Sequence, residues 1–305
     1  MNGQQQLELA SLCRTVRWDV DMAAHSTFRA GGIVEAMVET ESVEELAALL
    51  RWLHRERIPW HVVGGGSNIL VTGRYREGVF IRLRGTVRTN RCERDGDSFL
   101  VRVSAGCNLA ALLGWCARGN FGGLEFLAGI PGSVGGAIRM NAGAFGRAIG
   151  EALAAVQCLD ERGEPVTVSR EQAVFSYRFT RLPAEPQVRM VITEGVFRLQ
   201  AADGFRVTAQ CREIIAQRRS KQPQGVGSAG SFFKNPQGDF AGRLIEQAGL
   251  KGRTIGRAMV SPKHANFIVN TGGAVPEDIV GLMEEVRQKV FEHSGVLLEP
   301  EVRIY

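Results

Sequence analysis

The sequence lacks the features that mark membrane and secreted proteins. Its longest apolar stretch, Leu109–Ala117, is far shorter than the roughly 18 residues that a membrane-spanning helix needs. The first residues contain no basic region followed by an apolar one, so the sequence predicts no signal peptide. A membrane protein is therefore excluded, and we expect a cytoplasmic location.

Cysteine pairs and nucleotide-loop motifs are also missing. Six cysteines are widely separated and form no CxxC pair, so we expect reduced thiols and no metal site. The ten prolines are too few for a Pro-rich linker protein. No GxxxxGK[ST] phosphate loop and no GxSxG nucleophile elbow occur. These absences disfavour a P-loop enzyme and a serine hydrolase.

Strong charge of one sign is absent too. The chain has 37 basic and 32 acidic residues, a net charge of +5, and no run of five like charges. Basic residues interleave at 82–94 and at 212–221, which gives only weak support for a nucleic-acid surface. An anionic small-molecule ligand explains the same excess, and we favour that interpretation.

Length and periodicity predict two domains that contain both helices and strands. At roughly 150 residues per domain, 305 residues indicate two, and we place the boundary near residue 200. Ser42 and Glu45 begin a helix with leucines at helical spacing, and strand Trp60–Val63 follows it. Further helices are expected at Leu109–Arg118, Thr208–Arg219, Asp239–Ala248 and Pro276–His293, and further strands at 153–200, His264–Asn270 and 302–305.

Glycine is the residue in excess: 37 of 305 residues, about 12%, are glycine, against a usual frequency of about 7%. The glycines gather in three segments that we expect to be loops, at 64–66, 119–146 and 225–238. The first follows a strand and can offer backbone N–H groups to a pyrophosphate, although an ordinary tight turn explains it equally well. The second predicts close approach to a flat or bulky ligand, with tight loop packing as the alternative. In the third, Ser231 is either a turn residue or a catalytic group.

Taken in order, these segments resemble one known enzyme family. The motifs are GGGSN (64–68), AGIPGSVGGAIRMNAGAFG (128–146), SYR (176–178), AGSFFKNP (229–236), KHANFIVN (263–270) and EPEVRI (299–304). Together they resemble the UDP-N-acetylenolpyruvoylglucosamine reductases (MurB) of peptidoglycan synthesis, from about residue 25 onward.

The resemblance implies a fold and a cofactor. The fold class is α+β, an FAD-binding fold of the vanillyl-alcohol-oxidase type in two subdomains (residues 1–75 and 76–200), with a substrate domain at 201–305. The GGGSN loop would hold the FAD pyrophosphate, and the 128–146 loops would follow the flavin. The implied FAD-binding residues are Gly64, Gly65, Gly66, Ser67, Asn68, Gly129, Ile130, Ser133 and Asn141.

The resemblance also implies a reaction in two halves. NADPH would reduce FAD, and the flavin would then pass a hydride to the enolpyruvyl ether of UDP-N-acetylglucosamine, giving UDP-N-acetylmuramate. Arg178 and Glu301 would stabilise the enolate, and Ser231 would protonate it. Without the resemblance, Arg178 would be interpreted as a strand-surface arginine and Glu301 as a solvated charge. Glu301 would need a raised pKa to act as a proton-bearing stabiliser.

Substrate contacts are expected from Tyr177, Lys221 and Asn235. Some members of the family carry an extra tyrosine loop over the substrate diphosphate, but Ser176–Gly195 is too short for one. The chain resembles the shorter type, which also tends to show the RRxxQP motif seen at 218–223. We expect a monomer that binds a UDP-sugar and NADPH but no nucleic acid.

Two other functions are consistent with parts of the sequence. A flavoprotein oxidase of the same fold would share the FAD loops but would not need Ser231, Arg178 and Glu301. A non-catalytic nucleotide- or nucleic-acid-binding protein would use the net positive charge and would contain no flavin.

Overall fold

The computed structural model describes residues 1–85 and 87–305 and divides into two compact units. The first unit contains residues 1–18, 36–65 and 77–216, and the second contains residues 19–35, 66–76 and 217–305. The second unit therefore combines two N-terminal segments with the C-terminal third of the chain. This division follows from packing and does not test binding. The FAD-binding roles predicted for 1–75 and 76–200 and the substrate-binding role predicted for 201–305 therefore stay predictions.

Most of a four-stranded sheet in the order β1-β2-β5-β3 lies in the first unit, and its strands β3 and β5 pair in parallel. Residues 19–21, 33–35 and 75–76 of its strands belong to the second unit. Helix α2 packs its leucines against the apolar side chains of β2 and β5. The elements of this part are α1 (Gly3–Leu12), β1 (Val16–Asp21), β2 (Ile33–Thr40), α2 (Val43–Glu56), β3 (Trp60–Val63) and β5 (Tyr75–Leu83).

The predicted helix at 42–57 is confirmed as α2, and its ends have local causes. The Ser42 hydroxyl accepts a hydrogen bond from Glu45 N, which satisfies one of the first N–H groups of the helix. Arg57 ends the helix in the left-handed conformation at φ 54°. The strand predicted immediately afterwards is confirmed as β3.

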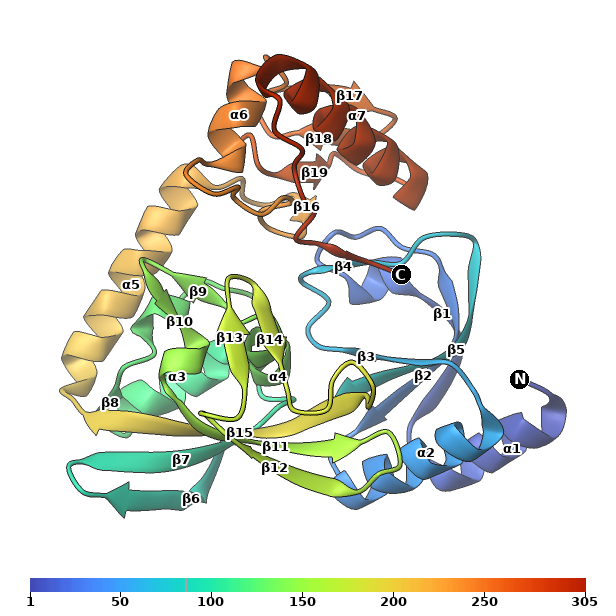
Figure 1. Cartoon of the computed structure of the whole chain (residues 1–305), viewed down its shortest axis with the longest axis vertical. Helices are drawn as coiled ribbons and strands as arrows, with labels where there is room; N and C mark the ends of the chain where they lie inside the picture. Colours follow the sequence, from blue (N-terminus) through green and yellow to red (C-terminus); the bar gives the residue numbers. More distant parts are fainter. Residues whose placement is uncertain (86) are drawn as a thin grey trace. The chain divides into compact units, whose positions relative to one another are not determined.

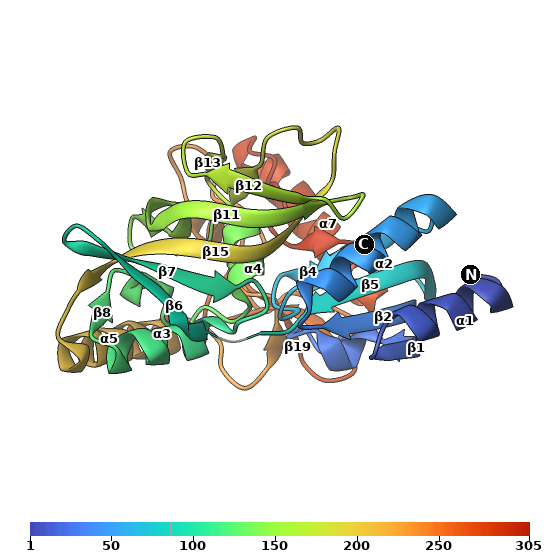
Figure 2. The ribbon, with the colours of Figure 1, turned by 90° about the horizontal axis from the view of Figure 1, so that it is seen from below.

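A larger sheet forms the rest of the first unit. Its strands run in the order β12-β11-β15-β7-β6, with β8 paired to one end of β15, and Figure 2 shows this order across the sheet. Side chains of α3 and α4 pack with those of the sheet in one apolar cluster. The elements are β6 (Val87–Asp95), β7 (Ser98–Ser104), α3 (Leu109–Arg118), β8 (Phe121–Gly122), β11 (Leu153–Asp160), β12 (Pro165–Ser169), β13 (Val174–Ser176), β14 (Phe179–Arg181) and β15 (Met190–Ala201).

The glycine-rich segment at 119–146 contains regular structure that the sequence did not predict. Alongside β8 it contains η2 (Glu125–Leu127) and α4 (Val134–Arg139), and a short hairpin begins at β9 (Gly143–Ala144) and ends at β10 (Arg147–Ala148), just before η3 (Ile149–Glu151). Glycine disfavours helices in general, yet Gly135 lies within α4 because a Cβ there would lie 2.8 Å from the Cβ of Ala105. The expectation of loops throughout this segment was therefore wrong: close helix packing, a tertiary effect, overrides local propensity.

The second unit contains the sheet β16-β19-β18-β17 and the helices α6 and α7, which Figure 1 draws in orange and red. These elements share one apolar core with Phe28 and Leu70 from the N-terminal segments. A second, parallel pair joins β4 to β20. The elements are η1 (Met22–His25), β4 (Ile69–Leu70), β16 (Gly227–Ser228), α6 (Ala241–Gln247), β17 (Thr254–Ile255), β18 (Ala258–Val260), β19 (Ile268–Asn270), α7 (Pro276–Ser294) and β20 (Arg303–Ile304), with α5 (Gly204–Lys221) passing from the first unit into the second.

Some predicted boundaries were wrong. Helix α5 begins four residues earlier than predicted because Asp203 caps it, accepting from Phe205 N with its carboxylate. The strand predicted from His264 begins only at Ile268, because Phe267 N donates to His264 O and closes a turn. Helix α7 is confirmed to within one residue of its predicted end.

All six cysteines are free thiols. Burial raises the pKa of Cys13, Cys116 and Cys158 to about 12, so these thiols are neutral at physiological pH. Among the described residues, no group of three or more His, Cys, Asp or Glu side chains is placed to hold a metal ion. Within the same residues, no helix has the length and hydrophobicity to cross a membrane.

Candidate functional site

The first glycine segment packs closely against other parts of the protein. A Cβ at Gly64 would lie 2.6 Å from Ser133 Oγ, and one at Gly65 would lie 2.9 Å from Gly132 Cα. In the second unit, Gly66 has φ +70°, and its Cβ would lie 2.0 Å from His25 O. Contact with protein backbone alone therefore requires glycine at 65 and 66, so the presence of glycine at these two positions does not by itself indicate a ligand.

Two predicted cofactor residues near α4, Ser133 and Asn141, have structural roles in the protein itself. Ser133 caps α4 by accepting from Gly136 N at 3.3 Å. Asn141 is buried, and its side chain donates to Ser176 O at 2.9 Å and accepts from Gly150 N at 3.1 Å. Both ends of the Asn141 amide therefore hold neighbouring loops together. Ser133 and Asn141 would shape a cofactor site chiefly through the main chain that they fix.

The other two predicted residues in this segment lie in the turn before α4. Gly129 has φ +77°, a conformation that favours glycine. Ile130 N donates to Leu127 O, and the Ile130 side chain packs against the core of the first unit. This turn sets the direction in which the chain enters α4.

Arg178 and Tyr177 form the two-residue turn of the β13–β14 hairpin, because Ser176 pairs with Phe179. Arg178 has φ +57° and donates from Nη1 to Gly143 O at 3.0 Å. Its guanidinium lies 5.3 Å from the centre of the Tyr177 ring, which is half exposed. The hairpin therefore presents a cation and an aromatic ring together, with the cation fixed to the β9–β10 hairpin.

In the second unit, Ser231 begins a segment whose next two residues are buried. Phe232 and Phe233 are almost completely inaccessible, and Phe232 contacts Phe28 in an edge-to-face arrangement. Phe232 N donates to Asn266 O at 2.7 Å. The partly buried Ser231 is therefore fixed by its neighbours along the chain.

Asn266 is a residue that the sequence analysis did not single out. Its side chain accepts from Phe233 N at 2.9 Å and donates to Phe233 O at 2.8 Å, and it is 3% exposed. Asn266 N donates to Nδ1 of His264, whose pKa is lowered by burial. A buried amide within the apolar run ANFIV is the sequence signal that could have identified it.

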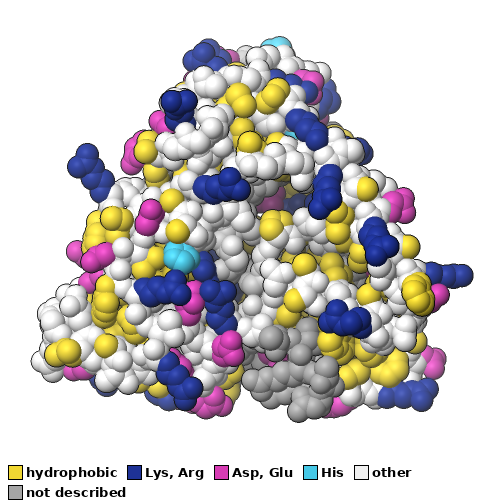
Figure 3. All heavy atoms as spheres, turned by 180° about the vertical axis from the view of Figure 1, so that it is seen from behind, with side chains coloured by type: hydrophobic (Ala, Val, Ile, Leu, Met, Phe, Trp, Pro, Cys, Tyr) yellow, Lys and Arg dark blue, Asp and Glu magenta, His cyan; other side chains and the backbone are white. Residues whose placement is uncertain are grey.

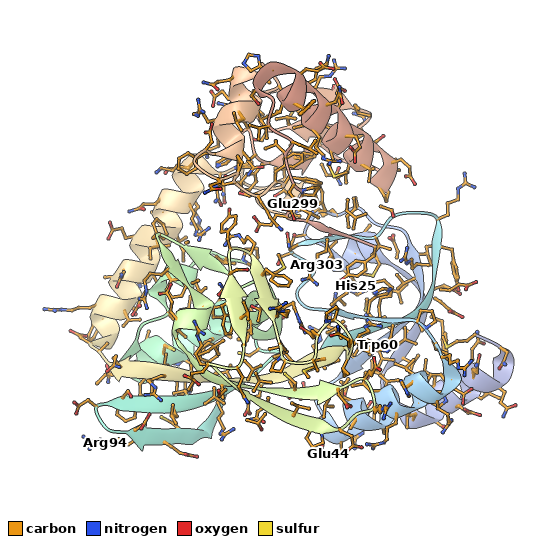
Figure 4. The ribbon with its side chains drawn as sticks, viewed as in Figure 1. His25, Glu44, Trp60, Arg94, Glu299 and Arg303 are labelled. Carbon is orange, nitrogen blue, oxygen red and sulfur yellow. The ribbon has the colours of Figure 1, made fainter. Side chains whose placement is uncertain are left out.

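Glu301 lies on the segment next to Ser231. Glu301 N donates to Phe232 O at 2.8 Å, and Phe233 forms a bridge with Pro300. On its other side, Glu301 O accepts from Asn68 Nδ2 at 3.1 Å. Figure 4 labels Glu299 and Arg303, which lie on either side of Glu301 along this segment. The structure thus brings Ser231 and Glu301 onto adjacent, hydrogen-bonded segments of the second unit, whereas Arg178 belongs to the first unit.

The remaining predicted substrate residues also lie in the second unit. Lys221 is the exposed last residue of α5, and the end of this helix is held by Lys263 Nζ, which donates to Arg219 O at 2.7 Å. Asn235 accepts from Ala241 N at 3.1 Å and so caps the start of α6. The face drawn in Figure 3 carries Lys and Arg side chains interspersed with Asp and Glu.

Two family models match successive parts of the chain. One describes an FAD binding domain and matches residues 34–169. The other describes the C-terminal domain of UDP-N-acetylenolpyruvoylglucosamine reductase and matches residues 222–305.

Curated proteins and solved structures agree with these matches. The UDP-N-acetylenolpyruvoylglucosamine reductase of Syntrophus aciditrophicus is 40% identical over 289 residues, which cover 95% of this chain and 91% of that protein. The protein of the same name from Lachnoclostridium phytofermentans is 36% identical over 309 residues, covering 100% and 98%. The crystal structure of UDP-N-acetylenolpyruvylglucosamine reductase (MurB) from Thermus caldophilus has a TM-score of 0.78 at 33% identity and covers 95% of this chain and 100% of that chain. The predicted α+β FAD-binding fold with a C-terminal domain is confirmed.

Proposed function

Since the chain belongs to the UDP-N-acetylenolpyruvoylglucosamine reductase family and is an FAD-dependent oxidoreductase, we propose that it reduces UDP-N-acetylglucosamine enolpyruvate to UDP-N-acetylmuramate with NADPH. This reaction supplies a precursor for peptidoglycan. The observation that carries the proposal is the pairing of the Ser231 segment with the Glu301 segment through the hydrogen bond from Glu301 N to Phe232 O.

The residues proposed for FAD fit it by their donor chemistry. A glycine turn directly after β3, followed by the Ser67 hydroxyl, offers the small N–H and O–H donors that suit a pyrophosphate. Gly64, Gly65, Gly66 and Ser67 would hold this group, and Gly129, Ile130, Ser133 and Asn141 would fix the main chain beside the ring system. When bound, FAD supplies the hydride that it has received from NADPH.

Arg178 is proposed to bind the carboxylate of the enolpyruvyl group. Its guanidinium has five N–H donors in a planar fork that matches a carboxylate, and the hydrogen bond from Nη1 to Gly143 O fixes its orientation. As hydride arrives at the methylene carbon, negative charge develops on the adjacent carbon and its carboxylate. A fixed cation stabilises that charge more than the ground state, which lowers the barrier.

Ser231 and Glu301 are proposed to complete the reaction at the same carbon. The Ser231 hydroxyl donates its proton to the carbanionic carbon, and the resulting alkoxide regains a proton from water. Glu301, bearing a proton, donates a hydrogen bond to the enolate as it forms. The main-chain hydrogen bond between their segments holds the two side chains in one region throughout.

The UDP part of the substrate is assigned to residues around these groups. Tyr177, beside Arg178, is proposed to pack against the substrate. Lys221 and Asn235 are proposed to bind the anionic and polar parts, since both lie at helix ends of the second unit. The enzyme is proposed to act as a monomer in the cytoplasm, where its nucleotide-activated substrate is made.

The test separates the two half-reactions in stopped-flow absorbance. Purified protein should be yellow, NADPH should bleach the flavin, and the enolpyruvyl substrate should restore its colour. In Ser231→Ala we expect bleaching by NADPH to continue at the original rate and reoxidation by substrate to fall by about 10²-fold or more.

Two outcomes would contradict the proposal. Equal loss of both half-reactions in Ser231→Ala would make Ser231 a structural residue. Steady NADPH oxidation that is independent of the enolpyruvyl substrate would instead indicate an oxidase of the same fold.

A further inference from the structure

Asn68 lies in the glycine-rich GGGSN segment, but its side chain contacts the C-terminal segment of the chain. Its Nδ2 donates to Glu301 O at 3.1 Å, and its main-chain O accepts from Arg303 N at 3.1 Å. Immediately afterwards β4 pairs in parallel with β20, with Ile69 opposite Arg303. All of these residues belong to the second unit. The side chain of Asn68 therefore holds Glu301, which lies two positions before the start of β20.

The peptide groups of Glu301 are fixed from two sides. Its N–H donates to Phe232 O, which ties it to the Ser231 segment, and its C=O accepts from Asn68. Between Glu301 and β20, Val302 is buried and adds an apolar anchor. With both main-chain groups held, the carboxyl of Glu301 projects from a defined backbone position beside Ser231.

We propose that Asn68 is a positioning residue for Glu301 and acts in the reduction of the substrate rather than in holding FAD. This inference rests on the proposed function, because it requires Glu301 to act on the enolpyruvyl group. Loss of the Asn68 amide would release the carbonyl of Glu301 and let its carboxyl shift. Catalysis is sensitive to such shifts, since about 1 Å of misplacement can cost about 10²-fold in rate.

A matched control lies a short distance along the same segment. Thr72 Oγ1 donates to Tyr305 O at 2.7 Å, so it makes the same kind of side-chain hydrogen bond to the C-terminal segment. Thr72→Val removes that hydrogen bond with little change in shape. Because it leaves Asn68 and Glu301 intact, it tests whether the loss of any side-chain hydrogen bond to the C-terminal segment slows the reaction.

The experiment compares Asn68→Ala, Asn68→Asp, Asn68→Gln and Thr72→Val in the full-length FAD-loaded protein. Flavin content and the visible spectrum are measured first, then the rates of flavin reduction by NADPH and reoxidation by the enolpyruvyl substrate. We expect Asn68→Ala and Asn68→Asp to retain flavin and the NADPH rate within about twofold, and to lose about 10- to 100-fold in reoxidation kcat with little change in KM. Asn68→Gln keeps an N–H donor and should recover part of that loss, whereas Thr72→Val should react like the unaltered protein.

Three results would overturn the inference while leaving the proposed function intact. They are loss of flavin in the Asn68 variants, an equal fall in both half-reactions, and a fall in Thr72→Val as large as that in Asn68→Ala. Glu301→Gln distinguishes failure of the inference about Asn68 from failure of the proposed role of Glu301. If it reoxidises normally with substrate, then the proposed role of Glu301 fails, and the inference about Asn68 fails with it.

Discussion

The buried amide of Asn266 gives the sharpest test of how the Ser231 segment is held. Asn266→Ala would remove both hydrogen-bond partners of the Phe233 main chain. These are the amide oxygen that accepts from Phe233 N at 2.9 Å and the amide nitrogen that donates to Phe233 O at 2.8 Å. Phe233 is 1% exposed, so water does not replace these partners without rearrangement. Each buried group left unsatisfied costs about 1–3 kcal/mol, and the pair therefore costs about 2–6 kcal/mol.

The measurement must report on the second unit specifically. Hydrogen exchange of peptides from residues 217–305, followed across a urea series, gives the free energy of unfolding there. Tryptophan fluorescence reports on the first unit for comparison, because all four tryptophans lie there: Trp18, Trp52, Trp60 and Trp115.

The control is an exposed amide of the same unit. Gln288 donates from Nε2 to Glu292 at 2.9 Å on the surface of α7, and Gln288→Ala should change the free energy of unfolding by less than about 0.5 kcal/mol. If Asn266→Ala and Gln288→Ala lower the free energy of unfolding of the second unit equally, the reasoning from burial and unsatisfied groups is refuted.

Two further perturbations follow from local geometry and from burial. Gly163→Ala should destabilise the protein by about 2–4 kcal/mol in urea unfolding, because it combines a φ of +75° with a Cβ placed 2.3 Å from a carbonyl oxygen of α2. Gly96→Ala, at φ +61° in open space, should cost only the strain of about 1–2 kcal/mol, and equal costs would contradict the steric argument. Burial lowers the pKa of His264 below its ordinary 6.5, so the unfolded chain takes up the proton first and stability should fall as pH drops below that value. His264→Gln should flatten this part of the stability profile between pH 7.5 and 5.5, and an unchanged slope would assign it to other groups.

The elements that the sequence predicted well are those with local causes. The helix α2 follows from a serine cap and leucines at helical spacing, and α3 and α7 follow from similar signals. The helix α4 was missed because its glycines disfavour a helix locally. Gly135 is explained by its close approach to Ala105, which is 30 positions away in the sequence.

The candidate site shows the same limit. The motifs identified Ser231, Arg178 and Glu301, but spacing along the chain could not show that Glu301 N bonds to Phe232 O. It also could not show that Asn68 contacts Glu301, because 233 positions separate them. Gly65 was interpreted through a ligand, whereas contact with the backbone of Gly132 is sufficient to require glycine there.

The pairing of β4 with β20 also bears on how the chain is made. Ile69 and Leu70 leave the ribosome long before their strand partners Arg303 and Ile304, which are synthesised 234 positions later. During translation the apolar side chains of the 19–35 and 66–76 segments therefore stay exposed until their core partners in the C-terminal third have been synthesised. This interval exposes Phe28 and Leu70 to chaperones and to misassociation, and the pairing of β4 cannot form until β20 has been synthesised.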